Sequence, residues 1–175
     1  MLSHHFQRTF LRVLLLLSLL AASGAHAVDV AQEYALKAAF IYNFAKFIEW
    51  PKPAAGSFNI CLVGRDNFGS SLDSLERKTV KDLPIRLHRG LGGEGLRQCQ
   101  MLFFGDRGVS ARELAQYAEQ GSLTLADHAG FIEQGGIFVL DLEQNRLVFD
   151  VNLEAARRAN FSISSRLLRL ARKVR

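Results

Sequence analysis

The 175-residue sequence contains only 3 prolines and 2 cysteines. So little proline, together with 49% hydrophobic and 22% charged residues, excludes collagen-like repeats and a disordered chain. Two cysteines are too few for a disulfide-dense mini-protein. The length suits one hydrophobic core better than two, so we expect a single domain and not a multidomain enzyme.

Long apolar runs are also missing. The longest covers residues 13–22 and is too short to span a bilayer. Two arginines precede this run, and Ala-His-Ala at residues 25–27 follows it as a small-residue cleavage site, which is the order of a secretory signal peptide. We therefore predict a signal peptide over residues 1–27 and an exported, soluble domain over residues 28–175. No cysteine stands at the cleavage point, so a lipid anchor is not expected.

Positive charge is concentrated at the C-terminus. The formal net charge is +5, but seven of the basic residues follow Glu154, and the segment from residue 28 to residue 154 has 13 basic and 17 acidic residues. A mildly acidic body argues against a nucleic-acid partner. The basic end suits the C-terminus of a helix, an anionic lipid surface or an acidic partner protein.

The two cysteines accompany two short apolar segments. Cys61 lies within residues 58–64, and Cys99 shortly precedes residues 101–105. Both segments predict buried strands that end at glycine. If these strands are parallel neighbours, one bridge can cross the strand spacing of ~4.8 Å. Export favours a disulfide between Cys61 and Cys99, while two buried free thiols, or a metal-binding or catalytic role, remain as alternatives.

Helix and strand signals alternate along the chain, which is typical of the α/β class. The expected helix caps are Asp66, Ser110 with Glu113, Asn152, and either Ser162 or Ser164. Predicted helices cover residues 31–50, 66–75 and 110–119, one begins at 153, and a basic amphipathic helix closes the chain to 175. Predicted strands cover residues 58–64, 85–88, 101–105, 123–126, 137–142 and 146–151. We predict a three-layer α/β/α sandwich with a mostly parallel sheet and an antiparallel hairpin at its edge.

Motifs that carry catalysis or hold a cofactor are missing. The chain has no histidine pair at zinc-binding spacing, no G-x-S-x-G elbow and no phosphate-binding glycine loop. Beyond the signal peptide its histidines are His88 and His128, and the sequence does not place carboxylates such as Asp127 and Asp141 near one another. We therefore predict that the protein is not an enzyme and has no cofactor or metal site.

Two features suggest a surface for a partner protein. Six aromatic residues lie within the predicted first helix, more than one helix face can bury, so some of them should be exposed. The C-terminal helices carry arginines on their outer face. Candidate partner-binding residues are Tyr42, Phe47, Trp50, Arg157, Arg158, Arg166 and Arg169. A helix packed wholly into the core and a simple solvated basic face are the alternatives.

Several segments together resemble the YfiR family over nearly the whole predicted domain. They cover residues 33–51, 60–64 with Phe68-Gly69, 99–104 and 135–174. The last segment is the most specific and contains Phe149, Asn152-Leu153, Ala155-Ala156-Arg157, Ser164-Ser165 and Leu167-Leu168-Arg169-Leu170-Ala171. The order and the spacing of all four segments match the family pattern.

This resemblance implies a non-enzymatic repressor in the periplasm. YfiR-like proteins bind the periplasmic domain of an inner-membrane diguanylate cyclase and hold it inactive, and an outer-membrane lipoprotein can sequester the repressor. Release of the cyclase raises cyclic di-GMP and favours biofilm. The family is also linked to homodimers and to redox sensitivity through disulfides. A second cysteine pair found in relatives of the founding member is missing between Ala126 and Gly136, so the resemblance carries over only Cys61 and Cys99.

A different function fits the same α/β pattern. A small-molecule sensor would bind a periplasmic solute at the carboxyl ends of the parallel strands, near residues 64–66 and 105–107, and act on another membrane receptor. The sequence leaves this alternative open.

Overall fold

The computed structural model describes residues 25–105 and 108–175. The chain divides into two units, Met1–Gln32 and Glu33–Arg175, and the second unit contains all the described strands. Residues 1–24 lie outside the described residues, so the signal peptide and the domain that begins at residue 28 stay predictions. Within the described part of the chain, no helix is long and apolar enough to cross a membrane.

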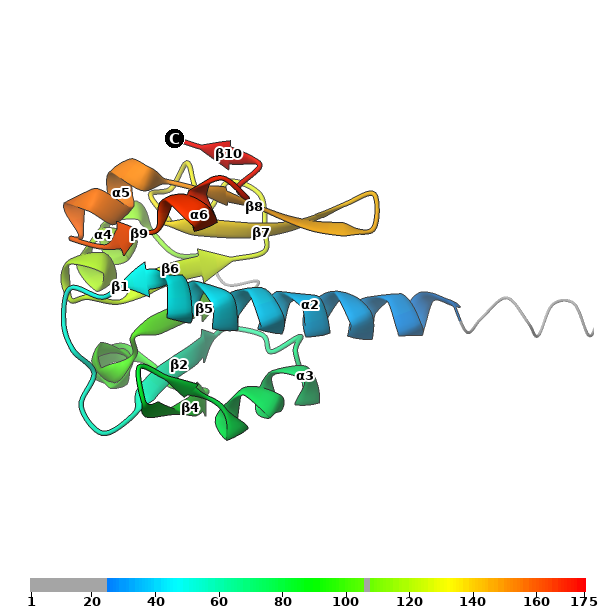
Figure 1. Ribbon diagram of the computed structural model, residues 1–175, viewed down its shortest axis with the longest axis horizontal. Coiled ribbons are helices and arrows are strands. Elements are labelled where there is room, and N and C mark those ends of the chain that lie inside the picture. The colour runs from blue at the N-terminus through cyan, green and yellow to red at the C-terminus, as the bar shows by residue number, and fades with distance from the viewer. Residues whose placement is uncertain (1–24, 106–107) are drawn as a thin grey trace, which may run out of the picture. The chain divides into compact units, whose positions relative to one another are not determined.

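Eight of the ten described strands form one mixed sheet, in the order β10-β8-β7-β6-β5-β2-β4-β3 (Figure 1), and β1 and β9 form a separate two-stranded sheet. Neighbours run parallel except in the pairs β7–β8 and β3–β4. This arrangement confirms the predicted α/β class and the antiparallel hairpin, with one more strand, β10, outside that hairpin. The strands are β2 Phe58–Val63, β3 Thr79–Val80, β4 Leu83–Arg89, β5 Met101–Phe104, β6 Leu123–Ala126, β7 Phe138–Glu143, β8 Arg146–Val151 and β10 Lys173–Val174.

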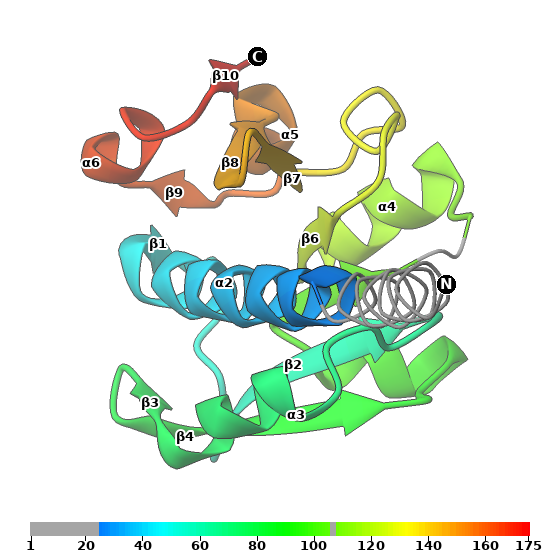
Figure 2. The same ribbon diagram turned by 90° about the vertical axis from the view of Figure 1, so that its right-hand side faces the viewer.

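Helices cover both faces of the sheet because alternate strand residues point to opposite sides (Figure 2). On β2, Ile60 and Leu62 belong to the core beneath helix α2, whereas Cys61 and Val63 belong to the core beneath α4. The layers are therefore helix, sheet and helix. The helices are α2 Ala25–Phe47, α3 Ser70–Asp73, α4 Ala111–Glu119, α5 Leu153–Arg158 and α6 Ser165–Leu168, with 3-10 turns η2 Ser74–Arg77 and η3 Gly93–Gln98.

Local signals explain several of these boundaries. Ser110 accepts a hydrogen bond from the backbone N–H of Glu113, whose carboxylate accepts one from the Ser110 N–H, so α4 begins with the predicted capping box. Asn152 caps α5 as predicted. The β7–β8 turn places Gln144 at φ 50° and Asn145 at φ 59°, the left-handed pair that a tight two-residue hairpin needs.

The first helix ends earlier than predicted. It stops at Phe47, and Ile48–Glu49 form a short strand, β1, which pairs antiparallel with β9, Ser162–Ile163. Pro51 disfavours helical backbone at the residue before it, and the edge of β9 offers the backbone an alternative set of hydrogen bonds. The predicted extension to residue 50 is therefore wrong by one turn.

The helix after β2 also differs from its prediction. Asp66 does not cap it, because the helix begins at Ser70 after Gly69, whose φ is 51°. The Asp66 carboxylate instead accepts a hydrogen bond from the Phe68 N–H at 2.8 Å and pairs with Arg89 at 2.7 Å. Asp66 thus shapes the turn before α3 and ties it to β4.

The predicted basic helix at the C-terminus is largely wrong. Ser164 caps α6, as one of the two expected caps, but α6 ends at Leu168, and Leu170 is 69% exposed instead of facing inward. The chain then returns to the sheet as β10, parallel to β8. Arg172 explains this return, because its guanidinium forms an ion pair with a carboxylate on each strand of the hairpin.

The Arg172 cluster is made by residues far apart in the sequence. The guanidinium binds Asp150 through two hydrogen bonds of 2.8 Å and lies 2.9 Å from Asp141, and it also pairs with Glu143. Hydrogen bonds to Asp150 and Asp141 raise the pKa of Arg172 well above its ordinary value. Such a planar, forked donor suits several carboxylates better than a lysine would.

Helix α2 is fixed across the sheet by aromatic packing. Phe44 is fully buried, and its ring stacks on Phe138 at 4.5 Å and meets Phe149 edge-on at 5.1 Å. Phe40 adds a further edge contact with Phe149 at 5.9 Å. These rings join α2 to the antiparallel hairpin by the contact geometry that aromatic pairs prefer.

A buried charge fixes the same helix to Asp127, the residue that follows β6. Lys37 is only 3% exposed, and its ammonium lies 2.6 Å from Asp127 and 2.5 Å from Glu33. Tyr34 donates a hydrogen bond to the same Asp127 oxygen at 3.0 Å. Burial lowers the pKa of Lys37, but its hydrogen bonds to Asp127 and Glu33 outweigh this effect and raise the pKa above its ordinary value.

Replacing Lys37 by methionine should lower the free energy of unfolding by about 2–3 kcal/mol at pH 7, because Asp127 loses its buried partner. The raised pKa makes the contribution of Lys37 complete below the unfolded-state pKa of ~10.4, and the contribution is lost as pH rises through the folded-state value. Urea unfolding at several pH values measures both effects. Lys46→Met, an exposed change on the same helix, should shift stability by no more than ~0.5 kcal/mol. Equal losses for the two variants would contradict the account.

Candidate functional site

The small β1–β9 sheet brings together two regions that the sequence suggested separately. Ile48 pairs with Ile163 and Glu49 with Ser162, so the end of α2 lies beside the start of α6. The Ser164 N–H also donates to the carbonyl of Phe47 at 3.3 Å. Phe47 is 39% exposed, and the guanidinium carbon of Arg166 lies 5.8 Å from the centre of its ring. An aromatic ring and an arginine therefore stand together at the surface.

The four candidate arginines all lie in the C-terminal part of the chain, and one of them, Arg166, makes this contact. Arg157 and Arg158 end α5, Arg166 lies in α6, and Arg169 follows α6 directly; all four are exposed. Arg158 pairs with Glu154 one turn earlier. Among the described residues, Arg157 and Arg169 have no carboxylate partner within ion-pair distance. We call Phe47, Arg157, Arg158, Arg166 and Arg169 the basic surface.

Two other candidate residues lie apart from the Phe47–Arg166 contact. Tyr42 is half-buried and donates a hydrogen bond to the Thr79 carbonyl at 3.3 Å, while the ammonium of Lys78 lies over its ring at 5.0 Å. Trp50 packs edge-on against Phe58 and Phe161 at 4.9 and 5.5 Å. Of the three aromatic candidates, Phe47 is the one that contacts a candidate arginine, Arg166, and helix periodicity alone did not single it out.

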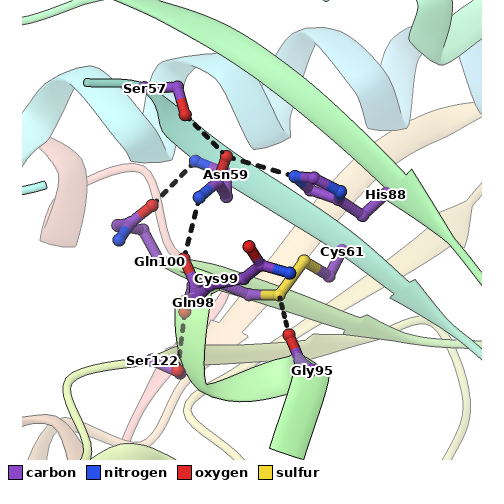
Figure 3. The surroundings of a disulfide bond; sticks show 9 residues. All are labelled: Ser57, Asn59, Cys61, His88, Gly95, Gln98, Cys99, Gln100 and Ser122. Atoms are coloured by element: carbon purple, nitrogen blue, oxygen red, sulfur yellow. Dashed lines mark hydrogen bonds between the residues drawn. A yellow bond between two sulfur atoms is a disulfide. The ribbon is translucent and has the colours of Figure 1, made fainter. Parts of the chain in front are cut away.

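Cys61 and Cys99 form a disulfide, as the sequence favoured (Figure 3). Cys61 lies in β2 and Cys99 lies two residues before β5, the parallel neighbour of β2. The two Cα atoms are 5.9 Å apart. Both sulfur-bearing residues are buried in the core under α4. The bridge closes a loop across a sequence separation of 38 residues that includes β3 and β4.

A polar network borders the disulfide on β2. Asn59 donates from its backbone to Gln100 at 2.7 Å and from its side chain to the Gln98 carbonyl at 2.9 Å (Figure 3). Its side-chain oxygen accepts from Ser57 and lies 3.2 Å from a ring nitrogen of His88. His88 therefore has a hydrogen-bond partner on the neighbouring strand, and this contact gives it a structural role.

The carboxylates that the sequence could not place do meet at one cavity. Asp127, Asp141 and His128 line a cavity of about 240 Å³ that also contains Arg172. Both carboxylates already bind a cation, because Asp127 pairs with Lys37 and Asp141 with Arg172. Within residues 25–105 and 108–175, no group of three histidine, cysteine or acidic side chains could hold a metal ion. The two carboxylates therefore have a structural role as ion-pair partners of Lys37 and Arg172.

The alternative solute site was expected at the carboxyl ends of the parallel strands, near residues 64–66 and 105–107. The described residues of this region are closely packed. A side chain added at Gly105 would come within 2.4 Å of the Arg65 carbonyl, and the Gly105 N–H donates to the Val63 carbonyl at 3.0 Å. The backbone after β2 and the backbone after β5 are therefore in direct contact at Arg65 and Gly105. Residues 106–107, which belonged to the same suggestion, lie outside the described residues.

Comparison with known families identifies this architecture. The YfiR/HmsC-like family matches residues 34–172, which include the C-terminal part of α2, the disulfide, the hairpin and the basic surface. The chain belongs to the YfiR/HmsC-like family. The resemblance inferred from the sequence is thus confirmed, and this regulatory family is not known for enzymatic activity.

Two solved structures show a distant likeness. A conserved domain protein from Vibrio cholerae O1 biovar El Tor matches with 10% identity and a TM-score of 0.46, over 79% of this chain and 60% of that one. An ABC domain in complex with L-Trp from Streptococcus pneumonia matches with 10% identity and a TM-score of 0.46, over 68% of this chain and 55% of that one. This chain therefore spans about 60% or less of the structures that it matches.

Replacing both cysteines by alanine should lower the free energy of unfolding by about 4 kcal/mol, because the reduced chain gains the entropy of an open 38-residue loop. Urea unfolding of the oxidised protein and of Cys61→Ala/Cys99→Ala measures the difference. Dithiothreitol should destabilise the unmodified protein and leave the double variant unchanged. A double variant as stable as the oxidised protein would show that the bridge does not hold β2 and β5 together.

Proposed function

We propose that this protein is a periplasmic regulator that represses an inner-membrane diguanylate cyclase by binding the periplasmic domain of that enzyme. The observation that carries the proposal is the family match over residues 34–172. Lower cyclic di-GMP and less biofilm are the consequences in the cell. Release by an outer-membrane lipoprotein and formation of homodimers belong to the same proposal, as the family resemblance implies them.

The basic surface supports a protein partner by its chemistry. Arginine and aromatic residues are enriched at the energetic centres of protein interfaces, and here Arg166 lies over the partly exposed ring of Phe47. Arg157 and Arg169 have no carboxylate partner among the described residues. The complementary surface on the receptor is therefore acidic, with an apolar group to meet Phe47.

Export to the periplasm is supported by two independent features. Residues 1–27 have the basic, apolar and small-residue regions of a signal peptide in order. The Cys61–Cys99 disulfide is of a kind that persists in oxidising compartments and is rare in the cytosol. Both features suit a protein that works where the sensor domain of an inner-membrane enzyme is exposed.

Repression by binding requires a preference between two states of the receptor. A repressor that binds the inactive cyclase ~10²-fold more tightly than the active one shifts the equilibrium by about 2.7 kcal/mol. The protein then needs no catalytic group of its own. A sequestering lipoprotein would relieve repression by lowering the free concentration of the repressor.

Charge reversal at the basic surface tests this proposal in the cell. Arg157→Glu or Arg169→Glu should weaken the complex by about tenfold or more, since each places a carboxylate against an acidic receptor surface. Cyclic di-GMP in a strain that carries either variant should rise toward the level of a deletion strain. Circular dichroism and a melting curve of the purified variants should match those of the unmodified protein, since both arginines are exposed.

Arg86→Glu provides the matched control, because Arg86 is an exposed arginine on β4, in a different part of the domain. This control should repress fully. Full repression by the folded Arg157→Glu and Arg169→Glu variants would remove the basic surface from the proposal. Unchanged cyclic di-GMP in the deletion strain would overturn the regulatory function itself.

A further inference from the structure

An apolar pocket of about 200 Å³ opens at the edge of the sheet where β2 begins, on a part of the domain that the proposed function does not use. It lies between the segment that follows α2 and the β3–β4 turn. Its lining residues are Trp50, Lys52, Pro53, Ala54, Phe58, Val80, Lys81, Leu83 and Gln100.

The inner surface of this pocket is apolar and fixed. Phe58 and Val80 are 2% and 1% exposed, and the ring of Trp50 is held edge-on against Phe58 at 4.9 Å. The indole N–H of Trp50 donates to the Ala45 carbonyl at 3.1 Å, so its single polar group is already bonded. The wall that Trp50 offers to the pocket is therefore a rigid hydrocarbon face.

The rim of the pocket offers hydrogen-bond donors and positive charge. The ammonium of Lys52 donates one hydrogen bond to the Gln120 carbonyl at 3.0 Å. Its two other N–H groups remain as donors for a ligand. Lys81 is exposed and held in a left-handed turn at φ 48°. Gln100 uses its side-chain oxygen to accept the Asn59 N–H at 2.7 Å, so its amide NH2 is the group left to donate. None of the described lining residues is acidic.

We propose that this pocket binds a small apolar monocarboxylate, with the hydrocarbon part against the accessible faces of Trp50, Ala54 and Leu83, above the buried floor of Phe58 and Val80, and the carboxylate at the rim that carries Lys52 and Lys81. The volume is below the ~300–1,000 Å³ that drug-sized ligands occupy, so a short aliphatic or single-ring acid suits it. Two ammonium groups without a neighbouring acid in the lining favour an anion over a neutral or cationic ligand. The inference does not depend on the receptor proposed above.

Trp50 is the single tryptophan of the chain, so its fluorescence reports directly on this pocket. Octanoate, titrated into the purified full chain, should change Trp50 emission in a saturable way. Octanamide has the same hydrocarbon part without the charge and should bind about tenfold more weakly, as two exposed ion pairs are lost. High salt should weaken the binding of octanoate and leave octanamide unaffected.

Variants locate the site and test the charge separately. Lys52→Met/Lys81→Met should lower the affinity for octanoate about tenfold and leave the affinity for octanamide unchanged. Ala54→Phe fills the pocket without adding a tryptophan and should abolish the response to both compounds. Lys173→Met, which removes an equal charge on β10, is the control and should bind octanoate normally.

Several results would overturn the proposal. These are no saturable change with octanoate, equal affinity for octanoate and octanamide, or full binding by the folded Ala54→Phe variant. Because none of these measurements involves a cyclase, they can fail while the repressor function stands, and the reverse is also true.

Discussion

The packing of helix α2 against the sheet is the constraint on which the rest of the domain depends. Phe44 inserts between Phe138 and Phe149, and Lys37 is buried against Asp127. A buried ammonium tolerates little displacement, because an unpaired charge in the interior is costly. These contacts fix where α2 lies on the sheet, and this position places β1 beside β9 and Phe47 at the surface.

Two further links close the domain around that helix. The disulfide joins β2 to the segment before β5, and Arg172 ties the C-terminal strand to both strands of the hairpin. The last strand also supports α5, since the carbonyl of Arg175 accepts hydrogen bonds from the N–H groups of Leu153 and Glu154. The start of α5 is thus bonded to the end of the chain, and the segment after α6 is bonded to β8 through the Arg172 N–H and the Phe149 carbonyl at 2.8 Å.

Sequence reasoning succeeded where the signal is local. The capping box at Ser110, the cap at Asn152 and the alternation of short apolar strands are set by neighbouring residues, and all three were confirmed. The cysteine pair was predictable because both segments had the pattern of buried strands. The family pattern added the order of the elements over residues 34–172.

Prediction from the sequence failed where residues far apart in the chain determine the structure. Residues 166–175 have a helical pattern, but Arg172 finds Asp141 and Asp150, which lie 31 and 22 positions earlier, and these partners draw the chain into the sheet. The contact between Phe47 and Arg166 depends on the pairing of β1 with β9, which no local sequence pattern predicted. The apolar pocket at Trp50 likewise combines segments around residues 50, 80 and 100.

The central claim is that this protein acts by binding a membrane-anchored diguanylate cyclase. The most direct measurement is a pull-down of the tagged processed protein from detergent-solubilised inner membrane of its own host, with mass spectrometry of the retained proteins. The account predicts recovery of a diguanylate cyclase with a periplasmic domain, and its loss when Arg166 is replaced by glutamate. Recovery of no membrane protein, with the bait folded and its disulfide formed, would contradict it.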